Sequence, residues 1–543
     1  MRLYNITEFP FFSFWLGDMH PHVMALPFGL LALALALATL ARPDPYLAAP
    51  GVRGWLDVLL TGLILGSLYV INSWDLPTYL LLYLGALFLL QVRHNDDPDA
   101  FPWKRLGWQG GLVVLVSFAL FTPFYLTFHS LVGSGEPLTS VPILSKFTQM
   151  VAPVSTSRTG IHAFLIIFGL FAAPLIAFAY LAKPLLPQPH PQPEPDEQRP
   201  SLLPWLFPAA LVVGVVVGFP LLSMAALALF AFYRAMYRAT RPAESFVLLV
   251  VALGGAILFG TDLMYIRDVF NTRMNTIFKF YYQVWLLWGT LAGYALWWLI
   301  AQPSPTPATT SNPPSPAPAP QEGEEEERMG EEKTDRCSAP VRPAPRLNPE
   351  HLVRWSVGVL FVGFLAGALV FPALTLGRMA EQGTLVGLSG RTPREHTSAG
   401  QASIAWLREH ASPDQVLLEM VPPGGGSYSP EGHAGVSAST GIPTVIGWVG
   451  HERQWRGGDE AAKQELDPRQ KDVDTIYATL DPQEALDLLA KYGVTYIYVG
   501  GLERRAYSAE SLAKFDTIAE PVFQQGEVVI YRVRLPPETG TGG

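Results

Sequence analysis

The sequence is poor in cysteine and in charged residues. Cys337 is the only cysteine among 543 residues, so the chain can form neither an internal disulfide nor a zinc site built on cysteine ligands. Charged residues make up 15% of the chain and hydrophobic residues 49%. The formal net charge of -9 at pH 7 argues against nucleic acid as a partner. We therefore expect most of this chain to lie in a lipid bilayer.

Long apolar runs predict about ten membrane spans. The first run, from about Val23 to Leu40, contains no charged residue and is long enough to cross a hydrocarbon core of roughly 30 Å as a helix. Gly218 and Pro220 separate two closely spaced runs, where a hairpin or a broken helix is expected. The predicted spans lie near 23–41, 55–72, 77–92, 108–127, 161–182, 203–219, 221–239, 244–261, 282–301 and 352–375.

The Lys and Arg residues of the short loops predict the orientation of these spans. Loops that contain Arg93 and Arg241, among others, fall on one side, which the positive-inside rule makes cytoplasmic. The opposite side then receives the segment before the first span, the 72–77 turn, the 261–283 segment and everything after Gly377. Every chemically suggestive motif is thus expected to face outward from the plasma membrane.

Composition divides the chain into four parts. We expect a multi-span membrane domain over 1–301, a disordered cytoplasmic linker rich in Pro and Glu over 302–350, and a last span over 351–376. Residues 377–543 alternate short strands and helices, which is typical of a layered α/β domain. The predicted fold is a polytopic α-helical membrane protein of about ten spans with a C-terminal extracytoplasmic α/β domain.

Carboxylates and imidazoles gather just before the first span. Glu8, Asp18, His20 and His22 are candidate catalytic residues there, because such groups activate a hydroxyl. Asp18 and His20 are also candidate ligands for a divalent metal, Mg²⁺ or Mn²⁺. The alternative is an interfacial role, in which the neighbouring aromatic residues form a membrane belt and Asp18 caps the helix.

The 261–283 segment is the densest polar cluster of the membrane part. If it is helical, Arg267, Asn271, Asn275 and Lys279 recur every four residues and form a polar stripe at the interface. Cations on this face suit a phosphate, although a solvated connector whose charges pair with local neighbours is the alternative. The candidate substrate-binding residues of the segment are Asp262, Arg267, Asp268, Asn271, Arg273, Lys279 and Tyr282.

Two further motifs carry candidate substrate-binding residues. Asp75, in Asn-Ser-Trp-Asp-Leu-Pro, lies at a predicted membrane edge, where helix capping explains it equally well. In the outer part, His451, Glu452 and Arg456 share a Gly-flanked loop with tryptophans, a composition suited to gripping a sugar or an acceptor. The alternative for this loop is packing against the membrane domain.

Three of these motifs resemble a known family. The runs from Glu8 to His22, from Asn72 to Asp75 and from Arg267 to Gln283 look like the bacterial and archaeal "YYY" membrane proteins (DUF2298). That family is in turn similar to the GT-C glycosyltransferases. Its members usually carry additional spans before the first motif, so we expect that N-terminal spans, and an acidic loop among them, are missing from this chain.

The resemblance implies transfer of a sugar from a polyprenyl-phosphate donor to a glycan or protein acceptor at the outer membrane face. Asp18 matches the acidic position of the GT-C enzymes and would act as a base or hold a metal, while Arg267, Arg273 and Lys279 would hold the phosphate. The competing interpretation is a membrane transporter, or a lipid-binding or cell-surface protein, that makes no chemical bond.

Overall fold

The computed structural model of the chain describes most of its residues. The described ranges are 8–16, 20–47, 52–95, 97, 100–128, 141–154, 158–182, 202–236, 241–268, 272–301, 349–381, 398–422, 433–456 and 460–534. Asp18, Asn271 and nearly all of the 302–350 linker lie outside them. The boundaries of the four predicted parts, and the cytoplasmic location of the linker, stay predictions.

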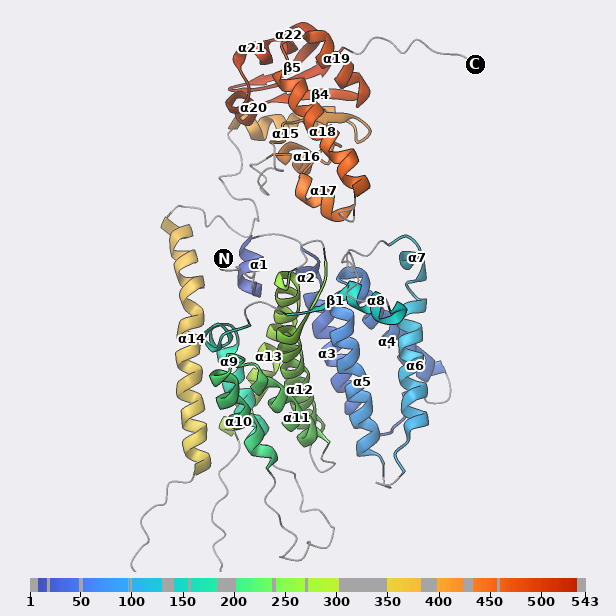
Figure 1. Cartoon of the computed structure of the whole chain (residues 1–543), viewed down its shortest axis with the longest axis vertical. Coiled ribbons are helices and arrows are strands. Elements are labelled where there is room, and N and C mark those ends of the chain that lie inside the picture. Colours follow the sequence, from blue (N-terminus) through green and yellow to red (C-terminus); the bar gives the residue numbers. More distant parts are fainter. Residues whose placement is uncertain are drawn as a thin grey trace, which may run out of the picture.

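The apolar runs form helices that pack lengthwise into a bundle (Figure 1). Six described helices are long and apolar enough to cross a membrane, namely α4, α5, α9, α12, α13 and α14. The shorter apolar helices α3, α10 and α11 match further predicted runs, and the count of about ten spans stays a prediction. The bounds are α3 Leu26–Leu40, α4 Val52–Ile71, α5 Asp75–Arg93, α6 Trp103–Ala119, α7 Thr122–Tyr125, α9 Ile161–Leu181, α10 Leu203–Val216, α11 Leu222–Ala235, α12 Pro242–Leu263, α13 Met274–Ala301 and α14 Pro349–Glu381.

Local sequence explains where these helices break and how closely they approach. Gly218 ends α10 with a φ of 72°, a conformation open to glycine, and α11 packs back against α10 as the expected hairpin. Deeper in the bundle, a Cβ added at Gly254 of α12 would lie 2.1 Å from Nε1 of Trp288 in α13. Trp288 is fully buried and donates from that nitrogen to the Val250 carbonyl oxygen at 3.3 Å. Glycine therefore lets α12 and α13 enclose a large aromatic side chain.

Short elements collect at one end of the bundle (Figure 1). They are α1 Pro10–Leu16, α2 Pro21–Met24, α8 Pro142–Met150, β1 Val151–Pro153 and β2 Met264–Ile266. β1 and β2 pair antiparallel, with Val151 opposite Ile266. The expected single helix over 261–283 is therefore wrong, because α12 ends at Leu263, the chain continues as strand β2, and α13 begins only at Met274.

The C-terminal part forms a separate α/β unit. Its sheet has the order β3-β4-β6-β5, in which β3 is parallel to β4 and the other neighbouring pairs are antiparallel. A core that includes Tyr477 and Phe515 fills the space between sheet and helices. The elements are α15 Ser398–His410, β3 Val416–Leu418, α16 Gly435–Thr440, α17 Val449–Trp455, α18 Glu460–Ala478, α19 Pro482–Lys491, β4 Val494–Val499, α20 Gly501–Ala506, α21 Ala509–Ala513, α22 Phe515–Ile518, β5 Ala519–Gln525 and β6 Val528–Val533.

Two buried carboxyl groups, Glu419 and Glu503, follow the parallel strands of this sheet. Glu419 accepts hydrogen bonds from the backbone N–H groups of Ser437 at 2.6 Å and Val436 at 3.0 Å. Glu503 accepts from the backbone N–H of Met420 at 3.2 Å. Burial raises the pKa of Glu419 to about 7, even though its N–H donors favour the ionised form. The domain therefore holds a carboxyl group that takes up a proton more readily than in the unfolded chain.

We predict that this carboxyl group makes the C-terminal domain less stable as the pH rises. Because the folded pKa of Glu419, about 7, exceeds its ordinary value of 4.5, the stabilisation is complete below pH 4.5 and is lost as the pH rises through 7. The loss is on the order of 3 kcal/mol. Pulse proteolysis of the full chain in urea at pH 5 and pH 8 measures it.

Glu419→Gln should remove most of this pH dependence, because the amide does not ionise. Glu510→Gln, which changes an exposed carboxyl group of α21, is the matched control and should keep the wild-type dependence. Equal pH dependence in wild type and Glu419→Gln would contradict the assignment.

Candidate functional site

A polar pocket lies beside the first turns of α13, at the end of the bundle that holds α1 and α2. The α13 residues Lys279, Tyr282, Gln283 and Leu286 recur at intervals of three or four residues, which places them on one helix face. With open solvent included, the empty volume of the pocket is about 230 Å³. It is lined by His22, Ala25, Leu26, Asp75, Tyr79, Lys279, Tyr282, Gln283 and Leu286.

Asp75, at the start of α5, supplies the carboxylate of this pocket. Its side chain is 5% exposed, and its Oδ1 accepts a hydrogen bond from Nε2 of Gln283 at 2.6 Å. The same Nε2 donates to the Trp74 carbonyl oxygen at 3.0 Å, and Oε1 of Gln283 accepts from the Thr78 hydroxyl at 2.5 Å. Because the Gln283 amide is fixed at both ends, the Asp75 carboxylate is held in one orientation.

Three charged or titratable groups contact one another in a row beside the pocket. His22 and Lys279 line the pocket, and Glu8 contacts His22 from outside the lining. Oε2 of Glu8 lies 3.1 Å from Nε2 of His22, and Nδ1 of His22 lies 3.3 Å from Nζ of Lys279. The Ser13 hydroxyl donates to the same Glu8 oxygen at 3.0 Å, and the Tyr282 hydroxyl donates to Ser13 at 3.3 Å. These contacts join the segment around α1 to α2 and α13.

The protonation states of these groups follow from their surroundings. Burial lowers the pKa of His22, although its bond to Glu8 opposes the shift. Burial alone would raise the pKa of Glu8, but the hydrogen bonds from His22 and Ser13 outweigh it and the pKa is lowered. At pH 7 an ionised Glu8 therefore faces a neutral His22. We assign the tautomer of His22 from its two partners: Nε2–H donates to Glu8, and Nδ1 accepts from the Lys279 ammonium.

The comparison with protein families matches the part of the chain that builds this pocket. The model of the family described as uncharacterized membrane protein (DUF2298) matches residues 3–288, a stretch that contains every pocket-lining residue. The chain belongs to this family. No curated protein and no solved structure matches it. The expected similarity of this DUF2298 protein to GT-C glycosyltransferases stays a prediction.

A second polar cluster of the DUF2298 protein holds α12 and α13 together, away from the pocket lining. Asp262 is fully buried, and its Oδ1 lies 3.0 Å from Nη2 of Arg273. The same carboxylate accepts from the backbone N–H and the hydroxyl of Thr159, at 3.0 and 2.8 Å. The Thr159 hydroxyl also lies 2.8 Å from that of Tyr281. These contacts give Asp262 and Arg273 a structural role.

The polar stripe expected over 261–283 is broken up by the fold of the DUF2298 protein. Arg267 is 7% exposed, and its Nη1 donates to the Thr148 carbonyl oxygen of α8 at 3.1 Å. Asp268 accepts from the Asn275 amide at 2.5 Å. Of the expected phosphate-holding cations, Lys279 lines the pocket, whereas Arg267 and Arg273 do not. The expectation of one stripe is wrong because α13 begins only at Met274, so Arg267 is not part of the helix that carries Asn275 and Lys279.

His20 lies beside the pocket, at the N-cap position of α2, with its ring centroid 5.5 Å from that of His22. Within the described ranges, no group of three or more His, Cys, Asp and Glu side chains could hold a metal ion. Asp18, the other expected metal ligand, lies outside those ranges. A metal held by Asp18 and His20 therefore stays a prediction.

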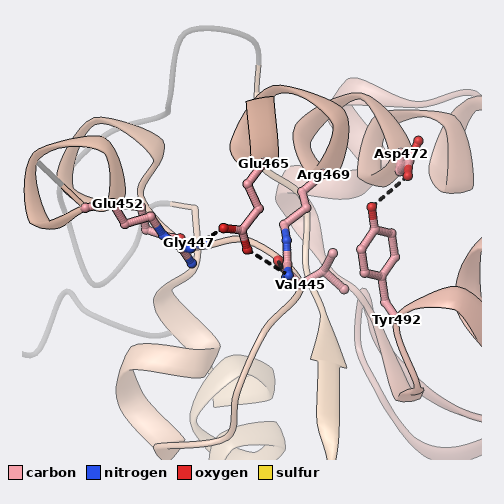
Figure 2. Close-up of polar contacts among 8 residues, drawn as sticks. Val445, Gly447, Glu452, Glu465, Arg469, Asp472 and Tyr492 are labelled. Atoms are coloured by element: carbon pink, nitrogen blue, oxygen red, sulfur yellow. Dashed lines mark hydrogen bonds and ion pairs between the residues drawn. The ribbon is translucent and has the colours of Figure 1, made fainter. Parts of the chain in front are cut away.

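His451 and Glu452 of α17, and Arg456 just after it, belong to the C-terminal unit. Oε1 of Glu452 accepts from the Gly447 N–H at 2.6 Å, and Arg456 pairs with Glu452 and with Glu465 of α18. Figure 2 shows Glu452 directed at Gly447, with Glu465 and Arg469 of α18 alongside. These ion pairs tie α17 to its own domain, and a role in sugar binding stays a prediction.

Three residues at the site, Gln283, Ser13 and Tyr79, are not among those predicted from the sequence. The signal for Gln283 was present, because it lies four residues after Lys279 and so on the same helix face. Ser13 carried no such signal, since its contact with Tyr282 depends on how α1 packs against α13.

We predict that Asp262→Asn destabilises the protein by about 3–5 kcal/mol, because it leaves a buried Arg273 without its anionic partner. Asp57→Asn is the matched control. Asp57 pairs with Arg42 at 3.1 Å but is 36% exposed, so the change should cost only about 0–1 kcal/mol. Thermal unfolding of both variants in the same detergent measures the difference. Equal melting temperatures for the two variants would contradict a structural role for Asp262.

Proposed function

We propose that this membrane protein is a glycosyltransferase that moves a sugar from a polyprenyl-phosphate donor to an acceptor at the outer face of the plasma membrane. One observation carries the proposal. The pocket at the end of the bundle presents the Asp75 carboxylate and the Lys279 ammonium together, each held by hydrogen bonds from neighbouring elements. A carboxylate and a cation in one pocket suit the two charge changes of sugar transfer.

Asp75 would act as the base of this reaction. As the acceptor oxygen forms a bond to the anomeric carbon, its hydroxyl proton passes to the Asp75 carboxylate. The bond between the anomeric carbon and the donor phosphate oxygen breaks, and the phosphate leaves with the electron pair. Gln283 keeps the carboxylate turned to one side, which lowers the entropy that must be lost on reaching the transition state.

Lys279 would stabilise the leaving phosphate, on which negative charge accumulates. A carboxylate in direct contact with Lys279 would neutralise that charge before the donor arrives. Instead, Nδ1 of the neutral His22 ring accepts a hydrogen bond from Lys279, and its Nε2–H donates one to Glu8. The ammonium is thereby held in place while its positive charge stays available to the phosphate.

The lining of the pocket suits a donor that is part lipid. Ala25, Leu26 and Leu286 are apolar and lie beside the charged groups, so a head group and the first carbons of a lipid chain find matching surfaces. Lys279 lies in the second turn of α13, near the end of the bundle, whereas transport sites lie near the middle of the membrane. The position therefore favours a lipid-linked substrate over a transported solute.

The proposed reaction also includes a metal ion and an acceptor. A divalent cation, Mg²⁺ or Mn²⁺, held by Asp18 and His20, would orient the donor phosphate. The acceptor would be a glycan or a protein, with the C-terminal domain outside the cell and His451, Glu452 and Arg456 beside the acceptor.

Sugar transfer from a panel of radiolabelled polyprenyl-phosphate sugars, with and without EDTA, tests the proposal. Asp75→Asn should lower kcat by about 100-fold or more with little change in KM, because it removes the base and keeps the volume. Lys279→Gln should lower kcat/KM for the donor by about 100-fold, because it removes a charge that faces the leaving phosphate.

The matched controls are Asp57→Asn and Lys104→Gln, which change a carboxylate and an ammonium outside the pocket and should keep wild-type rates. If the wild-type protein transfers sugar and the Asp75→Asn and Lys279→Gln variants transfer it equally fast, the roles assigned to Asp75 and Lys279 are refuted. Absence of transfer from every donor in the panel would count against the glycosyltransferase itself.

A further inference from the structure

An aromatic contact joins α14 to α1. The ring of Phe371 in α14 lies among four rings of the α1 segment, with centroids 5.7 Å from Phe9, 6.0 Å from Phe11, 6.3 Å from Phe12 and 6.4 Å from Trp15. Three of these arrangements are edge-to-face, with interplanar angles of 80° for Phe9, 90° for Phe11 and 88° for Trp15. Aromatic pairs of this kind each contribute about 0.5–1.5 kcal/mol beyond the area they bury.

This contact stands out because most of α14 faces away from the rest of the protein. Only 6% of its most apolar stretch is buried, and its main neighbour is α9. Pro372 follows Phe371 and has no N–H to donate, so a hydrogen bond of the helix is missing at this point and the helix bends more easily. Past this point α14 ends at Glu381, before the C-terminal domain.

The α1 segment, residues 8–16, contacts two residues that line the pocket, His22 and Tyr282. Ser13 of α1 donates to Glu8, and Glu8 meets His22, which lines the pocket. Tyr282, another lining residue, donates to Ser13. A shift of α1 would therefore move Glu8 away from His22 and loosen the support of Lys279.

We propose that Phe371 is a positioning residue for the pocket: its ring holds α1 so that Glu8 stays on His22. The proposal rests on the proposed function only in treating the pocket as the reaction site. The contacts that it invokes exist whether or not a sugar is transferred.

The modification rate of His22 by diethyl pyrocarbonate tests the proposal on the full chain in lipid nanodiscs. Mass spectrometry of the peptide separates His22 from His20. The His22 side chain is 3% exposed, so the wild-type rate should be low. Phe371→Ala should raise that rate several-fold, because α1 is released, and Phe371→Tyr should restore it, because the ring is kept. Phe361→Ala, roughly 15 Å away along the same helix, is the matched control and should keep the wild-type rate.

A double-mutant cycle separates positioning from general loosening. Glu8→Gln should also raise the His22 rate, and adding Phe371→Ala to it should bring no further increase, because both act through one contact. Phe371→Ala at the wild-type rate, or additive effects of the two changes, would overturn the proposal. The assay uses no sugar donor, so its result stands apart from the success or failure of the transferase assay.

Discussion

The arrangement of the pocket depends on how the Lys279 ammonium is stabilised at the membrane boundary. A cation in a partly desolvated site is costly unless polar groups surround it. The solution in this protein is an indirect one, in which a neutral imidazole accepts from the ammonium and an ionised carboxylate supports the imidazole. Three segments must meet for this purpose, namely the residues before α1, helix α2 and the second turn of α13.

Further features of the site follow from that meeting. With α2 packed against α13, the same face of α13 presents Gln283 to Asp75 at the start of α5, so a carboxylate and an ammonium face one small pocket. The start of α13 is fixed independently by the buried pair of Asp262 and Arg273, the residue just before the helix. One cluster thus holds the helix in place, and the other is free to serve a substrate. The proposed substrate, a lipid-linked phosphosugar, would pair its phosphate with the Lys279 ammonium of this pocket.

Part of this could be predicted from the sequence, and physical reasons limit the rest. The apolar runs predicted the long helices, and His22, Asp75 and Lys279 were each singled out by residue type and position. The sequence does not predict that these residues meet in one pocket, because 257 positions separate His22 from Lys279 and the contact depends on packing. The expected polar stripe failed because Arg267 lies in the connection between β2 and α13, outside the helix that carries Asn275 and Lys279. Arg273 pairs with Asp262 and does not line the pocket, so phosphate binding by Arg273 stays a prediction.

A cryo-EM structure of the full chain in nanodiscs, loaded with a polyprenyl-phosphate sugar, would show whether the pocket binds the donor. We expect density for the phosphate in the pocket, within hydrogen-bonding distance of Nζ of Lys279, with the sugar beside Asp75. Lipid density bound elsewhere on the bundle, with only water between Asp75 and Lys279, would contradict it.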